Sequence, residues 1–206
     1  MNFGELLTEF YGSGFDDLRG NATEEARAKR WVNNAVAEIC DEEPWPFLEE
    51  TKEGTAPQTF TNLGHVLSVT DVNNRNPLTV ADRRELVRID PTLQSTGTPE
   101  RWYMEGESTL KVYPANASVT IRTRYMKAVE ELTEESKTPP IPAKYHELIV
   151  VGASIRAYRN RDNWDAARAA RAEWKEGIQR MVKALIKKNY DTEKLVLRTG
   201  YSFDYL

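Results

Sequence analysis

Apolar residues with helical spacing predict helices near the start of the chain. A short helix over Phe3–Phe10 has apolar residues three and four positions apart, and Gly12-Ser13-Gly14 ends it. A longer helix begins after Asn21, a favourable N-cap residue, with Glu24 placed three positions later to complete a capping box. Pro44-Trp45-Pro46 ends this helix, because proline cannot continue the helical hydrogen bonds.

Two further helices are predicted toward the end of the chain. Pro142 is expected to be the first residue of one, where its missing N–H costs least. Apolar residues lie on most sides of this helix, which predicts a central position. After Asn160–Asn163, a long helix with a regular apolar seam is expected to run to about Lys188. The residues expected to be buried together in the helices are Trp31, Ile39, Leu148, Ile155, Trp174, Ile178 and Met181.

From about Thr55 to Lys127 the chain has the two-residue period of β-strands. Apolar and polar residues alternate over Val119–Tyr125, as expected for a sheet with one face in water. Leu110–Tyr113 ends at Pro114, and the two segments are predicted to form a hairpin. Further strands are expected at Val66–Val72 and Trp102–Met104. One helical turn is expected between them: Asp82 caps its start, Glu85 completes a capping box, and Asp90-Pro91 ends it.

This order of elements predicts an α+β protein, in which a helical bundle carries an antiparallel β-rich insert. The first helix has an apolar face that the later pair could cover, so the β segment is best placed as an excursion from the bundle. The expected divisions are a helical bundle domain of residues 1–50 and 139–188, a β-rich insert of residues 51–138, and an extended C-terminal arm of residues 189–206.

The arm has the alternation of a strand with one buried face. Its apolar residues stand mostly at odd positions, and its polar residues mostly at even ones. A disordered terminus and a strand of the subunit's own sheet are both open interpretations. We favour an arm that leaves its own subunit and adds to a neighbouring copy or to a partner protein through backbone hydrogen bonds and alternate side chains. The residues predicted to make these contacts are Leu195, Leu197, Tyr201, Phe203, Tyr205 and Leu206.

Composition narrows the class of protein. The chain has 206 residues, of which 40% are hydrophobic and 29% charged, enough for a core in one domain with an insert. No apolar run reaches the length that spans a bilayer, and Met1–Glu5 does not resemble a signal peptide. The single Cys40 implies neither a disulfide nor an oxidising compartment. A net charge of −4 argues against a general nucleic-acid coat.

Charge is unevenly distributed along the chain. Residues 38–53 hold seven acids and one base, whereas residues 156–188 hold ten bases and four acids. One interpretation is a solvated helix face. The other is a head-to-tail contact between copies that repeats into a ring. The residues predicted to make such inter-subunit charge contacts are Arg168, Arg171, Lys175, Glu42, Glu43 and Glu49.

The sequence offers little for catalysis. His65 and His146 are far apart and only one cysteine is present, so no zinc-binding spacing exists. Cys40 lies on an apolar helix face and is interpreted as a buried structural thiol. Arg122 and Arg124 suggest a single-stranded nucleic-acid platform, but the aromatic residues of that strand lie on the opposite pleat, so core packing is the better account. No catalytic residue, metal ligand or cofactor is predicted.

Several segments together resemble the head-to-tail adaptor proteins of tailed phages, the family that includes tail tubular protein A-like and podophage adaptor rings. Arg30–Cys40 followed by Trp45–Leu48 resembles the family's first long helix and its exit. Gly97–Pro99 with Trp102-Tyr103 resembles a turn and strand of its β region. Ile141–Ile149 resembles the start of the family's second bundle helix, and Asp162–Asp165 resembles the start of its third.

The resemblance implies a structural, non-enzymatic subunit of a virion at the head–tail junction, assembled in the host cytoplasm. Such subunits form a ring, most often of twelve copies, beneath the phage portal protein. The ring extends the channel through which DNA passes non-specifically, and it meets a downstream nozzle or stopper protein. No membrane partner is expected. The alternatives are a small nucleic-acid-binding module and a cell-wall hydrolase of the tail.

Overall fold

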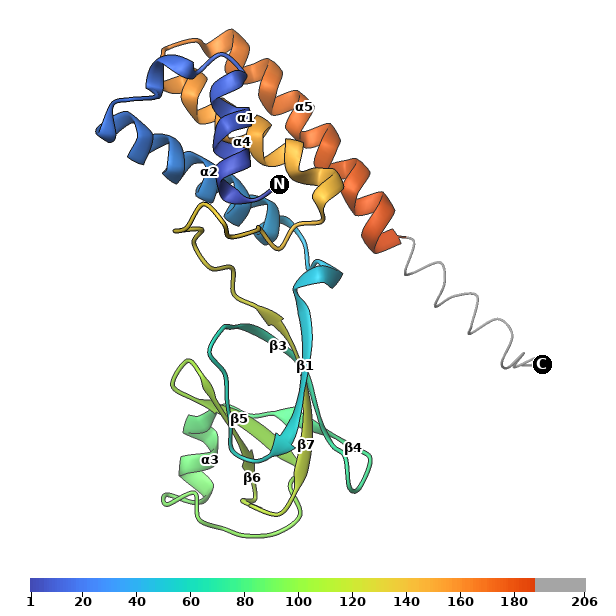
Figure 1. Cartoon of the computed structure of the whole chain (residues 1–206). Helices are drawn as coiled ribbons and strands as arrows, with labels where there is room; N and C mark the ends of the chain where they lie inside the picture. Colours follow the sequence, from blue (N-terminus) through green and yellow to red (C-terminus); the bar gives the residue numbers. More distant parts are fainter. Residues whose placement is uncertain (188–206) are drawn as a thin grey trace, which may run out of the picture. The chain divides into compact units, whose positions relative to one another are not determined.

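The computed structural model describes residues 1–187, which form two compact units. One unit contains Met1–Phe47 together with the described residues from Glu131 onward, and the other contains Leu48–Glu130 (Figure 1). Across the described residues the structure has five α-helices and one seven-stranded sheet. The predicted α+β fold class is confirmed. The arm predicted for residues 189–206 lies outside the described residues.

The helical unit is built around α4 (His146–Asn160), which contacts α1, α2 and α5. Most sides of α4 are buried, as its sequence predicted. Pro142 itself precedes a 3-10 turn rather than opening the α-helix. The other helical elements are α1 (Phe3–Gly12), η1 (Asp16–Leu18), α2 (Ala22–Glu42), η2 (Pro46–Leu48), η3 (Ala143–Tyr145), α5 (Trp164–Val182) and the π-helical turn η4 (Lys183–Lys187).

Polar side chains fix the starts of α1 and α2. Asn2 and Glu5 form a complete capping box on α1, with each side chain accepting from the other residue's N–H at 2.8–2.9 Å. At α2, Asn21 accepts from the N–H groups of Thr23 and Glu24, so the predicted cap is confirmed. The predicted return bond from Glu24 is wrong, because Glu24 binds Arg27. Glu25 instead accepts from the N–H of Gly20 at 2.8 Å.

The helical core contains almost all of the residues expected there. Ile39 and Met181 have no exposed surface, and Leu148, Ile155, Trp174 and Ile178 are each less than 10% exposed. Trp31 is only partly buried, because it lies at the margin of the unit with its ring edge against Phe10. Close helix packing depends on Gly177, where a side chain would collide with Leu148.

The segment that returns from the β unit is bonded to the helices. The N–H groups of Phe3 and Gly4 donate to the carbonyls of Lys137 and Glu135 at 2.8 and 3.0 Å. Asn33 of α2 binds the backbone of Leu132 in both directions, at 2.8 and 3.1 Å. These bonds satisfy the first N–H groups of α1 and fix the entry to α4.

The second unit is a strongly curled sheet with the strand order β1-β7-β3-β4-β5-β6-β2. Its strands β1 and β2 lie at opposite ends of this order, yet only Ala56 and Pro57 separate them in the chain. The sheet must therefore curl so that its two edges approach each other. The element bounds are β1 (Glu49–Thr55), β2 (Gln58–Thr59), β3 (Leu63–Asp71), β4 (Asn76–Val80), α3 (Arg83–Ile89), β5 (Arg101–Glu105), β6 (Thr109–Tyr113) and β7 (Thr120–Lys127).

Alternate residues of β7 point into the core of this unit, as predicted. Ile121 and Thr123 have no exposed surface, and the Tyr125 ring packs edge-on against Phe60 at 4.8 Å. The predicted hairpin between β6 and β7 is wrong. Strand β6 pairs with β5 and β2, whereas β7 pairs with β1 and β3. Alternation revealed each strand but carried no information about its partner.

Strand β1 and strand β4 were not predicted. Six of the seven residues of β1 are exposed or charged edge positions, so the strand lacks the apolar alternation that identifies a half-buried strand. In β4 only Leu78 is buried. The strands predicted over Val66–Val72 and Trp102–Met104 correspond to β3 and β5. Asp82 caps α3 through the N–H of Arg84, as expected.

Candidate interaction surfaces

The residues best suited to nucleophilic or metal chemistry are buried for structural reasons. Cys40 is 5% exposed, and burial raises the pKa of its thiol to about 12, so the reactive thiolate does not form near neutral pH. This confirms its interpretation as a structural thiol. The Nε2 and Nδ1 atoms of His146 lie 2.8 Å from the Ile141 carbonyl and from the Met1 amino group. Burial lowers the pKa of His146, which favours the neutral ring.

His65 lies on β3 in the other unit and is exposed. Within residues 1–187, no cluster of three or more His, Cys, Asp or Glu side chains is placed to hold a metal ion. In the same range, no helix has the length and apolar character to cross a bilayer.

Acids of β1 pair with bases of β7 along the outer face of the curled sheet. The pairs join Glu49 to Arg124 at 2.5 Å, Glu53 to Arg122 at 2.9 Å and Glu50 to Lys127 at 2.9 Å. The Tyr125 hydroxyl also donates to Glu50 at 2.8 Å. The hydrogen bond from Lys127, followed by that from Tyr125, lowers the pKa of Glu50. This arginine face is therefore matched by carboxylates of the same chain, which argues against a nucleic-acid platform.

The basic end of the helical unit is also partly neutralised within the chain. Arg156 makes two hydrogen bonds to Glu38 of α2. Arg161 pairs with Asp17, and Arg168 pairs with Asp165 on the next turn of α5. These pairs are exposed, so each contributes only about 0–1 kcal/mol.

Arg171 and Lys175 instead line a groove of about 510 Å³ between α5 and the end of α2. Its floor is apolar, with Trp174 and Ile178 8% and 7% exposed. Its rim carries charges of both signs. The lining residues are Glu42, Glu43, Arg171, Trp174, Lys175, Ile178, Gln179, Val182 and Lys183.

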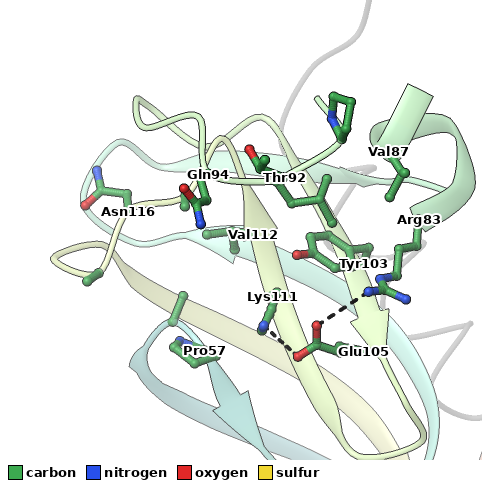
Figure 2. Close-up of a pocket in the computed structure, with 15 residues that line it drawn as sticks. Pro57, Arg83, Val87, Thr92, Gln94, Tyr103, Glu105, Lys111, Val112 and Asn116 are labelled. Atoms are coloured by element: carbon green, nitrogen blue, oxygen red, sulfur yellow. Dashed lines mark ion pairs between the residues drawn. The ribbon is translucent and has the colours of Figure 1, made fainter. Parts of the chain in front are cut away.

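A second cavity, of about 490 Å³, lies in the β unit beside the loop that follows α3 (Figure 2). Tyr103 of β5 forms its floor, and Val87 of α3 and Leu93 of the loop form an apolar wall. Asp90 fixes that loop. It accepts from the N–H and hydroxyl of Thr92 and from the N–H of Ser95, at 2.8–3.1 Å. These bonds, the one from Ser95 foremost, hold the pKa of Asp90 far below its usual range.

One end of this cavity is polar. Glu105 lies between two cations, with its carboxylate 2.6 Å from Lys111 Nζ and 3.9 Å from an Arg83 nitrogen (Figure 2). The hydrogen bond from Lys111 lowers the pKa of Glu105, so this carboxyl remains ionised and is unsuited to act as a general acid. Burial raises the pKa of Tyr103, which keeps its hydroxyl protonated as a hydrogen-bond donor. The arrangement suits binding rather than proton transfer.

Comparison with known protein families identifies the family to which the chain belongs. The sequence pattern of the SU10 adaptor protein family matches residues 1–199. The chain belongs to this family of phage head-to-tail adaptors. Comparison with curated proteins gave no match. The resemblance seen in the sequence is thereby confirmed, and this adaptor is a virion protein of a bacteriophage.

In this adaptor, the structure brings together four of the six residues predicted to make inter-subunit charge contacts. Glu42, Glu43, Arg171 and Lys175 line the groove beside α5. Arg168 lies one turn before Arg171 on the same helix, whereas Glu49 belongs to the other unit, where it pairs with Arg124. Sequence reasoning missed the cavity of the β unit, because its lining comes from several segments that are separate in the sequence. The exposed Trp164, Val80 and Ile89 were also missed as surface features.

Proposed function

We propose that this adaptor forms a ring of twelve copies beneath the portal, which extends the DNA channel and joins the portal to the tail. The observation that carries the proposal is the family match over residues 1–199. The partners are other copies of the chain, the portal protein, and a nozzle or stopper protein below. DNA passes through the ring without sequence recognition, and the protein acts structurally rather than as an enzyme.

The groove beside α5 supports a role for charge in the contact between copies. Its rim places Arg171 and Lys175 opposite Glu42 and Glu43 around an apolar floor. A neighbouring surface that carries charges of both signs would be complementary to such a rim. Exposed ion pairs are individually weak, so only a network repeated around a ring would contribute appreciably.

The C-terminal arm is proposed to attach the adaptor to a neighbouring copy or to the portal. Its alternating sequence is suited to strand addition, in which backbone hydrogen bonds give affinity and alternate side chains fill pockets. Deletion after Tyr190 should leave the melting temperature of the subunit unchanged and prevent its incorporation into the portal-bound ring. Normal incorporation of the shortened chain would refute the role of the arm.

The ring itself is tested by co-expressing the adaptor with the portal of the same phage. We expect an assembly that contains twelve adaptor chains per portal ring, measured by native mass spectrometry and seen as a ring in electron microscopy. Raising the salt concentration to 1 M, where the screening length is about 3 Å, should loosen the ring. Reversing Arg168 and Arg171 to Glu should loosen it as well. A chain that stays small in the presence of the portal would refute the ring.

A further inference from the structure

Trp164 is an exposed aromatic residue at the start of α5. It is the first residue of the helix, directly after the N-cap residue Asn163, and its side chain is 57% exposed. Tryptophan is buried to a high degree on average in folded proteins, so such exposure is unusual. Tryptophan is also among the residues that most often anchor a protein–protein contact, because its ring buries a large apolar area. The helical unit therefore presents an anchor that its own core does not use.

The groove beside α5 has the shape and chemistry to receive an aromatic ring. Trp174 and Ile178 form its apolar floor, and its volume of about 510 Å³ is in the range of pockets that enclose small molecules. Arg171 and Lys175 stand on its rim. These two cations favour an indole in particular, because the face of a tryptophan ring attracts a cation more strongly than that of any other side chain.

The charges at the rim of the groove are not paired with one another. Glu42 and Glu43 lie at the C-terminal end of α2, where the helix dipole disfavours negative charge and no basic residue is present in the last turn. Within residues 1–187, neither acid forms an ion pair, and neither Arg171 nor Lys175 forms one. Charges of both signs are therefore left for another surface to pair.

The turn that precedes Trp164 has charges that match this rim. Arg159 and Asp162 are exposed, and in the described part of the chain neither forms an ion pair. A copy whose Trp164 entered the groove would bring this base to the acids of α2 and this acid to the bases of α5. The start of α5 is also the positive end of its helix dipole, so it is suited to approach the acidic end of α2.

Like charges along α5 determine how two copies can meet. With 3.6 residues per turn, Trp164 lies on the same face of α5 as Arg171 and Lys175, and about 21 Å before Ile178. An antiparallel pair of α5 helices would set Arg168, Arg171 and Lys175 of one copy against the same bases of the other, which is unfavourable. The start of α5 in one copy must therefore meet the far end of α5 in the next, and Figure 1 shows these two ends at opposite ends of the helical unit. A contact between two different surfaces repeats in one direction and can close into a ring.

We propose that Trp164 of one copy inserts into the groove beside α5 of the next copy, with Arg159 at Glu42 and Glu43 and with Asp162 at the bases of α5. This inference rests on the proposed ring and names the contact that joins its copies. The portal as the partner of Trp164 is an outcome of the test.

The first test places the photo-reactive aromatic residue p-benzoylphenylalanine at position 164, where it keeps a large ring. Isotope-labelled chains that carry this residue are mixed with unlabelled, unmodified chains, assembled with the portal and irradiated. We expect mass spectrometry to find the labelled segment around position 164 linked to an unlabelled segment that contains Gln179 and Val182, which line the groove. Only contact between copies can produce such a mixed link.

The matched control carries the same photo-reactive residue at position 89 of α3, because Ile89 is 68% exposed and does not line the groove. Links from position 89 to the groove should be absent. Equal yields from positions 89 and 164 would overturn the proposal. Links from position 164 to the portal alone would also overturn it, and would assign Trp164 to the portal.

Truncation measures how much the anchor contributes. Trp164→Ala should raise the adaptor concentration at which half of the chains are in rings about thirtyfold, as for other anchors of this type. Trp164→Phe keeps a ring and should have a smaller effect. Ile89→Ala, which removes an equally exposed apolar side chain, should leave this concentration unchanged. The melting temperature of the dilute subunit should be the same for all three variants. Normal assembly of Trp164→Ala would contradict the proposal.

Charge exchange provides an independent test that leaves Trp164 in place. Arg159→Glu and Glu43→Arg should each raise the half-assembly concentration about tenfold, and the two changes together should restore most of the loss. Two independent, additive losses would contradict the pairing of these surfaces. Failure of the unmodified chain to form a ring with the portal would overturn the proposed function together with this contact. Normal rings from every variant would overturn the contact alone.

Discussion

Replacing Gln58 with leucine should destabilise the β unit, because the Gln58 amide joins neighbouring parts of the curled sheet. Gln58 is 3% exposed. Its Nε2 donates to the carbonyls of Gly54 and Ile121 at 3.2 and 3.0 Å, and its Oε1 accepts from the Thr123 hydroxyl at 2.9 Å. Leucine fills similar space without any polar atom, so the fully buried Thr123 hydroxyl would lose this partner.

The expected cost follows from the groups left without partners. A buried polar group that loses its partner costs about 1–3 kcal/mol. Gln58→Leu leaves the Thr123 hydroxyl unpaired and removes two bonds to carbonyls, so the free energy of unfolding should fall by about 2–4 kcal/mol. Thr123→Val removes one bond and should cost about 1–2 kcal/mol. The double variant should cost about 1 kcal/mol less than the sum, because the Thr123 hydroxyl that Gln58→Leu alone would leave unpaired is then absent.

The assay is urea unfolding followed by fluorine NMR of 5-fluorotryptophan-labelled protein. Trp102 is the one tryptophan of the β unit, so its resonance reports that unit alone. Gln179→Leu, at an exposed position of α5, is the control and should leave the Trp102 transition unchanged. If Gln58→Leu left the midpoint unchanged, or if the two costs were additive, the amide would not link the sheet as its geometry indicates.

Three further outcomes are expected. Cys40 should not react with a thiol reagent at pH 8 until the protein is unfolded, because burial raises its pKa to about 12; prompt labelling of the native protein would contradict its burial. Burial lowers the pKa of His146, so as the pH falls the unfolded chain binds a proton at this ring before the folded protein does, and the free energy of unfolding should decrease below about pH 6.5. The variant His146→Gln should show a smaller change of melting temperature between pH 7 and 5 than the unchanged protein. Trp174→Ala should cost about 3–5 kcal/mol and the partly buried Trp31→Ala less, measured by thermal unfolding.

The helices were predictable because their signals are local. The apolar period and the Asn21 cap lie within a few residues of each other, and the structure has α2 where they place it. Strand pairing is not local. The alternation of β7 identified its buried face, yet its partners are β1 and β3 rather than β6. Strand β1 could not be predicted from the sequence, because an edge strand with charged side chains lacks the apolar alternation that identifies a half-buried strand.

The candidate surfaces were also predictable only as far as their signals are local. A run of acidic residues can be seen in the sequence, but the basic residues that pair with them cannot. Glu49 and Glu53 were available in principle for another copy, and the structure pairs them with Arg124 and Arg122 across two adjacent strands. The cavity of the β unit gave no signal at all, because its polar end unites Arg83, Glu105 and Lys111 from three elements. Only tertiary structure places such residues together.

Some charged residues are paired within the chain and others line mixed charged and apolar surfaces, and this difference affects how one adaptor copy can bind another. Pairs such as Glu53–Arg122 are satisfied within one chain, so a second copy would have to break them before forming pairs of its own, with little net gain. The groove beside α5 and the polar end of the β cavity differ, because each combines charge with an apolar wall. Burying that wall supplies the free energy of contact, while the charges select the partner and its orientation. Surfaces of this mixed kind are therefore the ones expected to determine assembly.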